Sequence, residues 1–149
     1  MNLPPNSDRT AELRTAWLKF VVDQKPNLML KLGSGHGCSP PTLLRDAKDF
    51  FNHVQSDARG RHWRNCPPEE KPRAIGFVEH LKSNLHMHLA ARVLDPNLRA
   101  NFQNGAAIWR GIRRAGDFHA DLIEEPEKYA SYITKELRLP RTEEFIFIY

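Results

Sequence analysis

Two histidines one residue apart are the residues of this sequence best placed to do chemistry. His86 and His88 flank Met87 in an apolar stretch typical of a β-strand. Because side chains alternate between the two faces of a strand, both imidazoles point the same way, about 6–7 Å apart. Imidazoles at this spacing can share one divalent metal ion. The spacing fits equally well two polar residues on a half-exposed strand.

A carboxylate on the preceding apolar stretch completes a set of ligands. That stretch ends at Glu79, and a turn over residues 81–84 would form a hairpin with Glu79 opposite His86 and Phe77 opposite His88. We call Glu79, His86 and His88 the metal triad. Its oxygen and nitrogen donors suit Mg²⁺ or Mn²⁺ and are less specific for Zn²⁺. The assignment depends on this register, because a slip of one residue moves Glu79 to the other face.

A second group with chemical potential lies on a predicted helix further along the chain. Tyr129 and Tyr132 are three residues apart, and Lys135 follows Tyr132 at the same spacing. Residues three apart are neighbours on a helix surface. A tyrosine beside an ammonium group can attack a phosphodiester, and a nearby metal ion can polarise the phosphate. The same spacing also fits two tyrosines packed in the core with a solvated lysine.

Cations interleaved with an aromatic residue follow an earlier predicted helix. They are Arg59, Arg61, Trp63 and Arg64. Arginines can contact phosphates while a base stacks on an indole, so this cluster is a candidate for binding single-stranded DNA. A solvated helix end beside a core tryptophan is the alternative interpretation.

The composition predicts one domain of 149 residues, large enough to bury a core without disulfides. Its two cysteines are too few for a disulfide scaffold, which predicts a reduced, cytoplasmic protein. No run of about 18 apolar residues predicts a membrane span, and the first residues lack the pattern of a secretory signal. The net charge of +4 permits a polyanionic partner without requiring one.

The order of predicted elements indicates how these residues are positioned. A helical extension covers residues 1–24. Periodicity and Pro/Gly boundaries then predict a strand over 27–32, a helix over 41–60, paired strands around Glu79 and His86, a helical region over 95–116 broken near 104–105, a strand over 117–123, a helix over 126–137 and a β-rich end over 143–149. This β-α-β-β-α-β order predicts an α+β, ferredoxin-like split βαβ fold, an antiparallel sheet with helices on one face. The histidine strand would be interior, and the other face would be free to carry the site.

Together these motifs resemble those of the HUH endonucleases, the rolling-circle replication initiators of plasmids and phages. The histidine pair around a hydrophobic residue is followed by a helical Tyr-x-x-Lys, and Tyr132 to Lys135 is similar to the family's third motif. Residues 28–32 look like the family's first motif, an apolar strand. The family's metal-binding acid commonly lies on the strand before the histidines, where this chain has Glu79. The resemblance covers residues 27–137.

The resemblance implies a metal-dependent single-stranded DNA endonuclease and strand-transferase. The metal triad would hold Mg²⁺ or Mn²⁺. Tyr132 would attack the DNA to leave a 5′-phosphotyrosine and a free 3′-OH, with Lys135 assisting. Tyr129 would be a second nucleophile or a packing residue. The implied substrate is single-stranded DNA at an origin or hairpin of a plasmid, phage or related mobile element.

The chain contains no Gly-x-x-x-x-Gly-Lys-Ser/Thr nucleotide-binding motif, so a separate helicase is expected to unwind the DNA. Three alternatives stay open at this point. One is a transposase or relaxase-like enzyme that uses the same chemistry. Another is a ferredoxin-like domain that binds nucleic acid or a protein without cutting, and the third is a metal-dependent hydrolase with no covalent intermediate.

Overall fold

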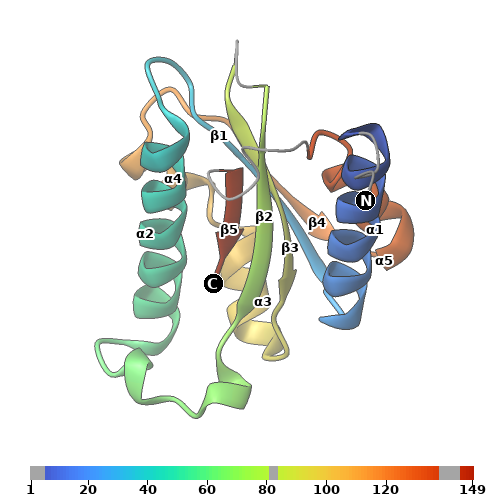
Figure 1. Cartoon of the computed structure of the whole chain (residues 1–149). Coiled ribbons are helices and arrows are strands. Elements are labelled where there is room, and N and C mark those ends of the chain that lie inside the picture. Colours follow the sequence, from blue (N-terminus) through green and yellow to red (C-terminus); the bar gives the residue numbers. More distant parts are fainter. Residues whose placement is uncertain (1–5, 81–83, 138–144) are drawn as a thin grey trace.

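The structure, a computed structural model, describes residues 6–80, 84–137 and 145–149, with side chains from Arg9 onward. In this part the chain forms five α-helices and a five-stranded antiparallel sheet, which confirms the α+β class (Figure 1). Most of the expected turn at 81–84, the first residues of the N-terminal extension and residues 143–144 of the last expected strand lie outside the described residues. None of the helices in these ranges is both long and apolar enough to cross a bilayer.

The elements lie close to the expected positions along the chain. The helices are α1 (Asn6–Asp23), α2 (Pro40–Arg59), α3 (Pro96–Gln103), α4 (Ala106–Ile112) and α5 (Pro126–Ile133), with short 3-10 helices η1 (Trp63–Asn65) and η2 (Pro68–Glu70). The strands are β1 (Leu28–Gly33), β2 (Arg73–Glu79), β3 (His86–Arg92), β4 (Phe118–Leu122) and β5 (Ile146–Ile148). The expected helix break near 104–105 is confirmed between α3 and α4.

The last helix is shorter than expected, because α5 ends at Ile133 rather than near Leu137. The hydroxyl of Thr134 donates to the carbonyl of Ala130 at 2.8 Å. A side chain that bonds back to the carbonyl four residues earlier competes with the helical pattern. Residues 134–136 form a turn instead of continuing the helix.

The sheet has the strand order β4-β1-β3-β2-β5, so the histidine strand β3 is interior, as expected. β2 and β3 pair antiparallel with Glu79 opposite His86 and Phe77 opposite His88. The register inferred from the sequence is therefore confirmed. Each of the two ligand-bearing strands is hydrogen-bonded to a neighbouring strand on both sides.

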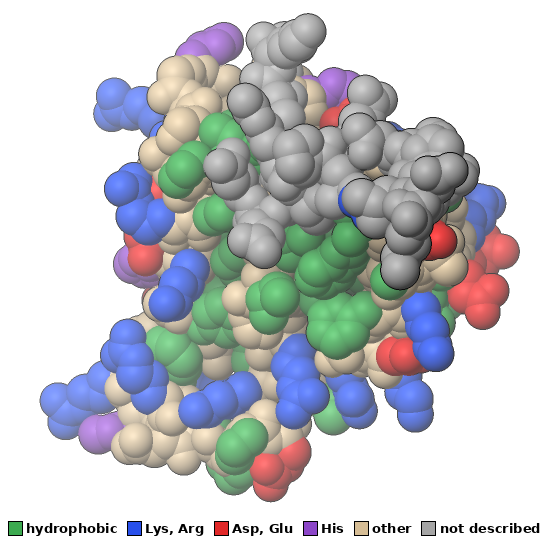
Figure 2. Space-filling model, viewed as in Figure 1, with side chains coloured by type: hydrophobic (Ala, Val, Ile, Leu, Met, Phe, Trp, Pro, Cys, Tyr) green, Lys and Arg blue, Asp and Glu red, His purple; other side chains and the backbone are tan. Residues whose placement is uncertain are grey.

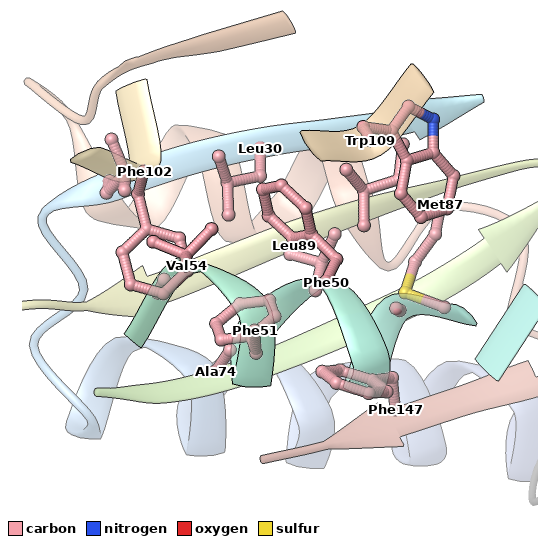
Figure 3. Close-up of a cluster of buried hydrophobic side chains, with 14 of the residues drawn as sticks. Leu30, Phe50, Phe51, Val54, Ala74, Met87, Leu89, Phe102, Trp109 and Phe147 are labelled. Carbon is pink, nitrogen blue, oxygen red and sulfur yellow. The ribbon is translucent and has the colours of Figure 1, made fainter. Parts of the chain in front are cut away.

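One face of the sheet is covered by α2, α3 and α4 and holds the larger core (Figure 3). Alternating leucines of β1 at positions 28, 30 and 32 point into it, as expected for a strand with one buried face. Phe50, Phe51 and Phe102 pack edge-on or tilted against one another at centroid distances of 4.9–6.0 Å. The indole N–H of Trp109 donates to the carbonyl of Gly33 at 3.0 Å, which satisfies its only polar group.

The opposite face is not free, contrary to the expectation from the sequence. α1 and α5 cover its β2–β3 half, where Ile75, Phe77 and Ala90 form a second apolar cluster with residues of both helices. Trp17 of α1 packs edge-on against Phe77, with ring centroids 5.8 Å apart. Apolar side chains on this half would otherwise contact water, so burying them under two helices stabilises the fold. Among the described residues, the two helices leave the β1–β4 half of this face less covered, and His119 is exposed there.

Candidate metal centre beside the tyrosine helix

The metal triad assembles at one end of the sheet, where β2 ends and β3 begins (the upper end in Figure 1). Oε2 of Glu79 lies 3.3 Å from Nε2 of His86 and 3.5 Å from Nε2 of His88. All three side chains are buried, Glu79 almost completely at 1 % exposure. The three residues form a group that could hold a metal ion. The convergence expected from strand pairing is therefore present.

Hydrogen-bond donors and acceptors in the triad are unbalanced in a way that favours a cation. Nδ1 of His86 lies 3.1 Å from the carbonyl oxygen of Asn84. In the tautomer that donates from Nδ1 to this carbonyl, Nε2 presents a lone pair to Glu79. Neither buried oxygen of Glu79 has a hydrogen-bond partner among the described residues. Acceptors that face one another without a donor are costly, and a metal ion between them removes this cost.

The protonation of His88 also suits metal binding. Burial lowers the pKa of His88 to about 4, although the nearby carboxylate of Glu79 opposes the shift. The ring is therefore neutral at physiological pH, and only a neutral imidazole has a nitrogen lone pair to give to a metal.

The catalytic candidates on α5 lie directly against the triad. The ring of Tyr132 meets the ring of His88 edge-on with centroids 5.1 Å apart, and Tyr132 is 48 % exposed. Nζ of Lys135, just beyond the helix, lies 3.8 Å from the centre of the Tyr132 ring and 3.9 Å from Oε2 of Glu79. Lys135 thus links the tyrosine to the triad, and the phenol stays accessible from solvent.

Tyr129 is placed differently from Tyr132. Its hydroxyl donates to the carbonyl of Leu89 on β3 at 2.8 Å. Burial raises the pKa of Tyr129, and the nearby carboxylate of Glu79 adds to the shift. A buried phenol that is already hydrogen-bonded and hard to ionise is poorly suited to nucleophilic attack. The geometry favours the packing role for Tyr129 over the role of second nucleophile.

The basic cluster at the end of α2 lies at the other end of the sheet from the triad, where β2 begins. Figure 2 shows Lys and Arg side chains gathered over α2 and along this lower edge of the molecule. Arg59 is largely buried and pairs with Asp95 at 3.3 Å, and Trp63 is buried under the guanidinium of Arg64. Arg61 is exposed. The structure does not bring these residues to the triad, and the side chains of Arg59 and Trp63 are largely buried.

Two residues beside the triad were missed by reasoning from strand alternation. Alternation continued past Glu79 leads to the expectation that His80 points away from the metal face, but its ring lies 4.8 Å from the ring of His86, centroid to centroid. The expectation is wrong because β2 ends at Glu79 and His80 has a φ of 58°, in the left-handed region. Nε2 of His80 lies 3.8 Å from Oε1 of Glu136, the second missed residue. No pattern in the sequence predicts the left-handed turn at His80.

A third missed residue, Lys31, did have a signal in the sequence. Alternation along β1 places it on the face opposite the buried leucines, and in the sheet it pairs with His88 on one side and His119 on the other. Its ammonium group lies 3.3 Å from Asp117 and stays partly exposed. Lys31 therefore extends the site from the triad onto the open half of the face.

Comparison with protein-family models, with curated proteins and with solved structures found no match to this chain. Function has to be inferred from the residues of the site themselves. They offer three buried ligands, an accessible phenol and an ammonium group. The phenol ring contacts His88, and the ammonium group lies 3.9 Å from Glu79.

Proposed function

We propose that this protein is a metal-dependent single-stranded DNA endonuclease and strand-transferase of the HUH type. The observation that carries the proposal is the contact of Tyr132 and Lys135 with the buried metal triad. The two motifs come from distant parts of the sequence, and each alone is common. Nicking by such an enzyme would initiate rolling-circle replication of a plasmid, phage or related mobile element, with a separate helicase unwinding the duplex.

The metal triad would hold Mg²⁺ or Mn²⁺, because two imidazoles and one carboxylate leave several octahedral positions for water and phosphate oxygens. The bound ion would supply Lewis-acid polarisation of the scissile phosphate. The residues fit this role because the oxygens of Glu79 are buried without a donor in the described part of the chain. β3 is hydrogen-bonded on both sides, so His86 and His88 are held in fixed positions.

Tyr132 would be the nucleophile. Its hydroxyl oxygen would bond to the scissile phosphorus and lose its proton, while the bond from phosphorus to the 3′-oxygen breaks. The 3′-oxygen takes up a proton and leaves as a free 3′-OH, and the 5′ end stays attached to the tyrosine. Lys135, with its ammonium group 3.8 Å from the Tyr132 ring, would stabilise negative charge on the phenolate and the phosphate. Rejoining is the same reaction in reverse.

The open β1–β4 half of the sheet face would carry the DNA backbone. Lys31 lies directly beside His88, and His119 lies beside Lys31 on the next strand. This row leads away from the triad and offers a cation to the phosphates next to the scissile one.

A pocket of about 420 Å³ between β4 and α5 would take a neighbouring base. Met29, Leu122 and Tyr132 line it together with several carboxylates, including Asp121 and Glu125. Apolar and aromatic surface suits the face of an unstacked base, and carboxylates can accept hydrogen bonds from base amino groups. The same carboxylates repel phosphates, which favours a path with the base in the pocket and the backbone on the Lys31 side.

The strand order supports the ferredoxin-like split βαβ fold that the proposed family implies. β1 and β2 flank β3 and are joined through α2, and β3 and β4 flank β1 and are joined through α3 and α4. In this strand order a strand of one βαβ unit lies between the two strands of the other, which supports the split arrangement.

The proposal is tested by trapping the covalent intermediate. The purified chain is incubated with a labelled, randomised single-stranded DNA pool and Mn²⁺, then run on a denaturing gel. A labelled band at the size of the protein that needs Mn²⁺ and is abolished by EDTA supports the proposal. Sequencing the trapped DNA then gives the cleavage site.

The non-cutting alternative makes the opposite forecast in the same experiment. A binding module would retain DNA on a native gel in a salt-dependent way and would leave it intact with every metal tested. That outcome would overturn the nuclease proposal.

A further inference from the structure

We propose that Glu79 is shared between two divalent cations, the second of which is held by His80 and Glu136. This inference rests on the proposed metal triad but not on the nuclease reaction. It concerns a carboxylate, an imidazole and a carboxylate that meet next to the triad at the ends of β2 and α5.

The geometry of the second group suits one divalent ion. One ligand atom from each of Glu79, His80 and Glu136 lies within 4.8 Å of the others, and Nε2 of His80 is 3.8 Å from Oε1 of Glu136. In an octahedron with bonds of about 2.1 Å, adjacent ligands are about 3.0 Å apart and opposite ones about 4.2 Å. Small side-chain rotations would bring the three atoms into this range.

The two oxygens of Glu79 have different surroundings. Oε2 faces His86 and His88, and the ammonium group of Lys135 is 3.9 Å away. Oε1, like Oε2, is buried without a hydrogen-bond partner in the ranges that the structure describes. A buried carboxylate oxygen needs a donor or a cation. A second ion bound through Oε1 would satisfy this oxygen and make Glu79 a bridging ligand, as in two-metal phosphoryl-transfer sites.

Glu136 is already oriented for this role. The backbone N–H of His80 donates to Oε2 of Glu136 at 3.1 Å. One oxygen of the carboxylate is thereby fixed, and the other faces the imidazole of His80. A ligand that is held by a second hydrogen bond loses less freedom when it binds a metal.

His80 is held toward the triad by an unfavourable backbone conformation. Its φ of 58° costs a non-glycine residue on the order of 1 kcal/mol. In a continued strand its ring would lie on the opposite face from Glu79, whereas here it lies beside the ring of His86, tilted by 31°. Strained backbone of this kind concentrates at binding sites, where the side chain must be aimed.

The second ion would give the scissile phosphate another positive contact. In two-metal sites, ions about 4 Å apart stabilise the attacking and the leaving oxygen of an in-line displacement. Here the two ions would share Glu79 as a ligand. Tyr132, the proposed nucleophile, lies next to His88 of the triad.

The experiment counts Mn²⁺ ions on the purified full chain without DNA, from the loss of the free-ion EPR signal during titration. We expect two ions per wild-type chain and one in the double variant His80→Gly/Glu136→Gln. Glycine adopts a positive φ without strain, so His80→Gly removes the imidazole and should not hinder folding. His53→Ala, which removes an exposed histidine of α2, is the matched control and should still bind two ions. Exchange coupling between neighbouring Mn²⁺ ions should appear in the wild-type spectrum and vanish in the double variant.

The other possible counts of bound Mn²⁺ distinguish between the second site, the triad and the nuclease proposal. A single ion on the saturated wild-type chain would overturn the inference and leave His80 and Glu136 as a polar contact between the end of β2 and the residues that follow α5. Two ions on the double variant would overturn it as well. A chain that binds no Mn²⁺ would overturn the triad together with the second site. A chain that binds two coupled ions but forms no DNA adduct would uphold this inference and overturn only the nuclease proposal.

Discussion

Replacing the two tyrosines of α5 by phenylalanine, one at a time, should separate catalysis from folding. Tyr132→Phe deletes the hydroxyl of a side chain that is 48 % exposed and keeps its ring against His88. Changes at such surface positions usually alter the free energy of unfolding by less than about 0.5 kcal/mol. The covalent DNA adduct should nevertheless disappear, because the attacking oxygen is gone.

Tyr129→Phe should have the reverse effect. It removes a donor that bonds the carbonyl of Leu89 at 2.8 Å. The net contribution of such a hydrogen bond is about 1 kcal/mol, and in a domain of this size that lowers Tm by about 3 °C. The adduct should still form at close to the wild-type rate, because Tyr132 and Lys135 keep their places beside the triad.

The two variants are compared in one pair of assays. Thermal denaturation followed by circular dichroism gives the change in Tm, and a denaturing gel with labelled single-stranded DNA and Mn²⁺ gives the adduct. Mass spectrometry of the trapped peptide identifies the modified residue. An adduct that persists in Tyr132→Phe, or one that maps to Tyr129, would refute the assignment of the nucleophile. An unchanged Tm in Tyr129→Phe would refute the structural role of its hydroxyl.

Three further predictions concern the triad and the DNA path. His86→Ala and His88→Ala should each abolish adduct formation and weaken Mn²⁺ binding at least about tenfold, measured by calorimetry; tight binding in the double variant would exclude the triad. In the metal-free protein, burial lowers the pKa of His88 from 6.5 to about 4, so between these values only the unfolded chain binds the proton. The free energy of unfolding should therefore fall by up to about 3 kcal/mol as the pH drops through this window, and His88→Asn should remove that part of the dependence in urea titrations. Lys31→Ala should weaken the binding of single-stranded DNA and reduce the number of ions released on binding, measured from its salt dependence, by about one. Arg61→Ala, at the far end of the sheet, should change the affinity and its salt dependence much less. Equal losses in the two variants would contradict the proposed DNA path.

The sequence by itself determined the local part of this site. Alternation along two neighbouring strands was enough to place Glu79 opposite His86 and to put His88 on the same face. These relations depend on residues close together in the chain and on the fixed geometry of an antiparallel pair. Helix limits marked by proline and glycine were equally readable, including the break between α3 and α4. The interior position of β3 followed from the order of the elements.

Only the tertiary structure decided which residues surround the metal triad. Tyr132 and Lys135 reach the triad only because α5 packs on the same face as His88, and the sequence pattern of α5 does not say which face it covers. His80 joins the triad through a left-handed backbone turn, which alternation cannot anticipate once a strand has ended. Arg59 is paired with Asp95, which lies far along the chain. Contacts between distant residues and the burial they produce are properties of the packed molecule, so no local pattern encodes them.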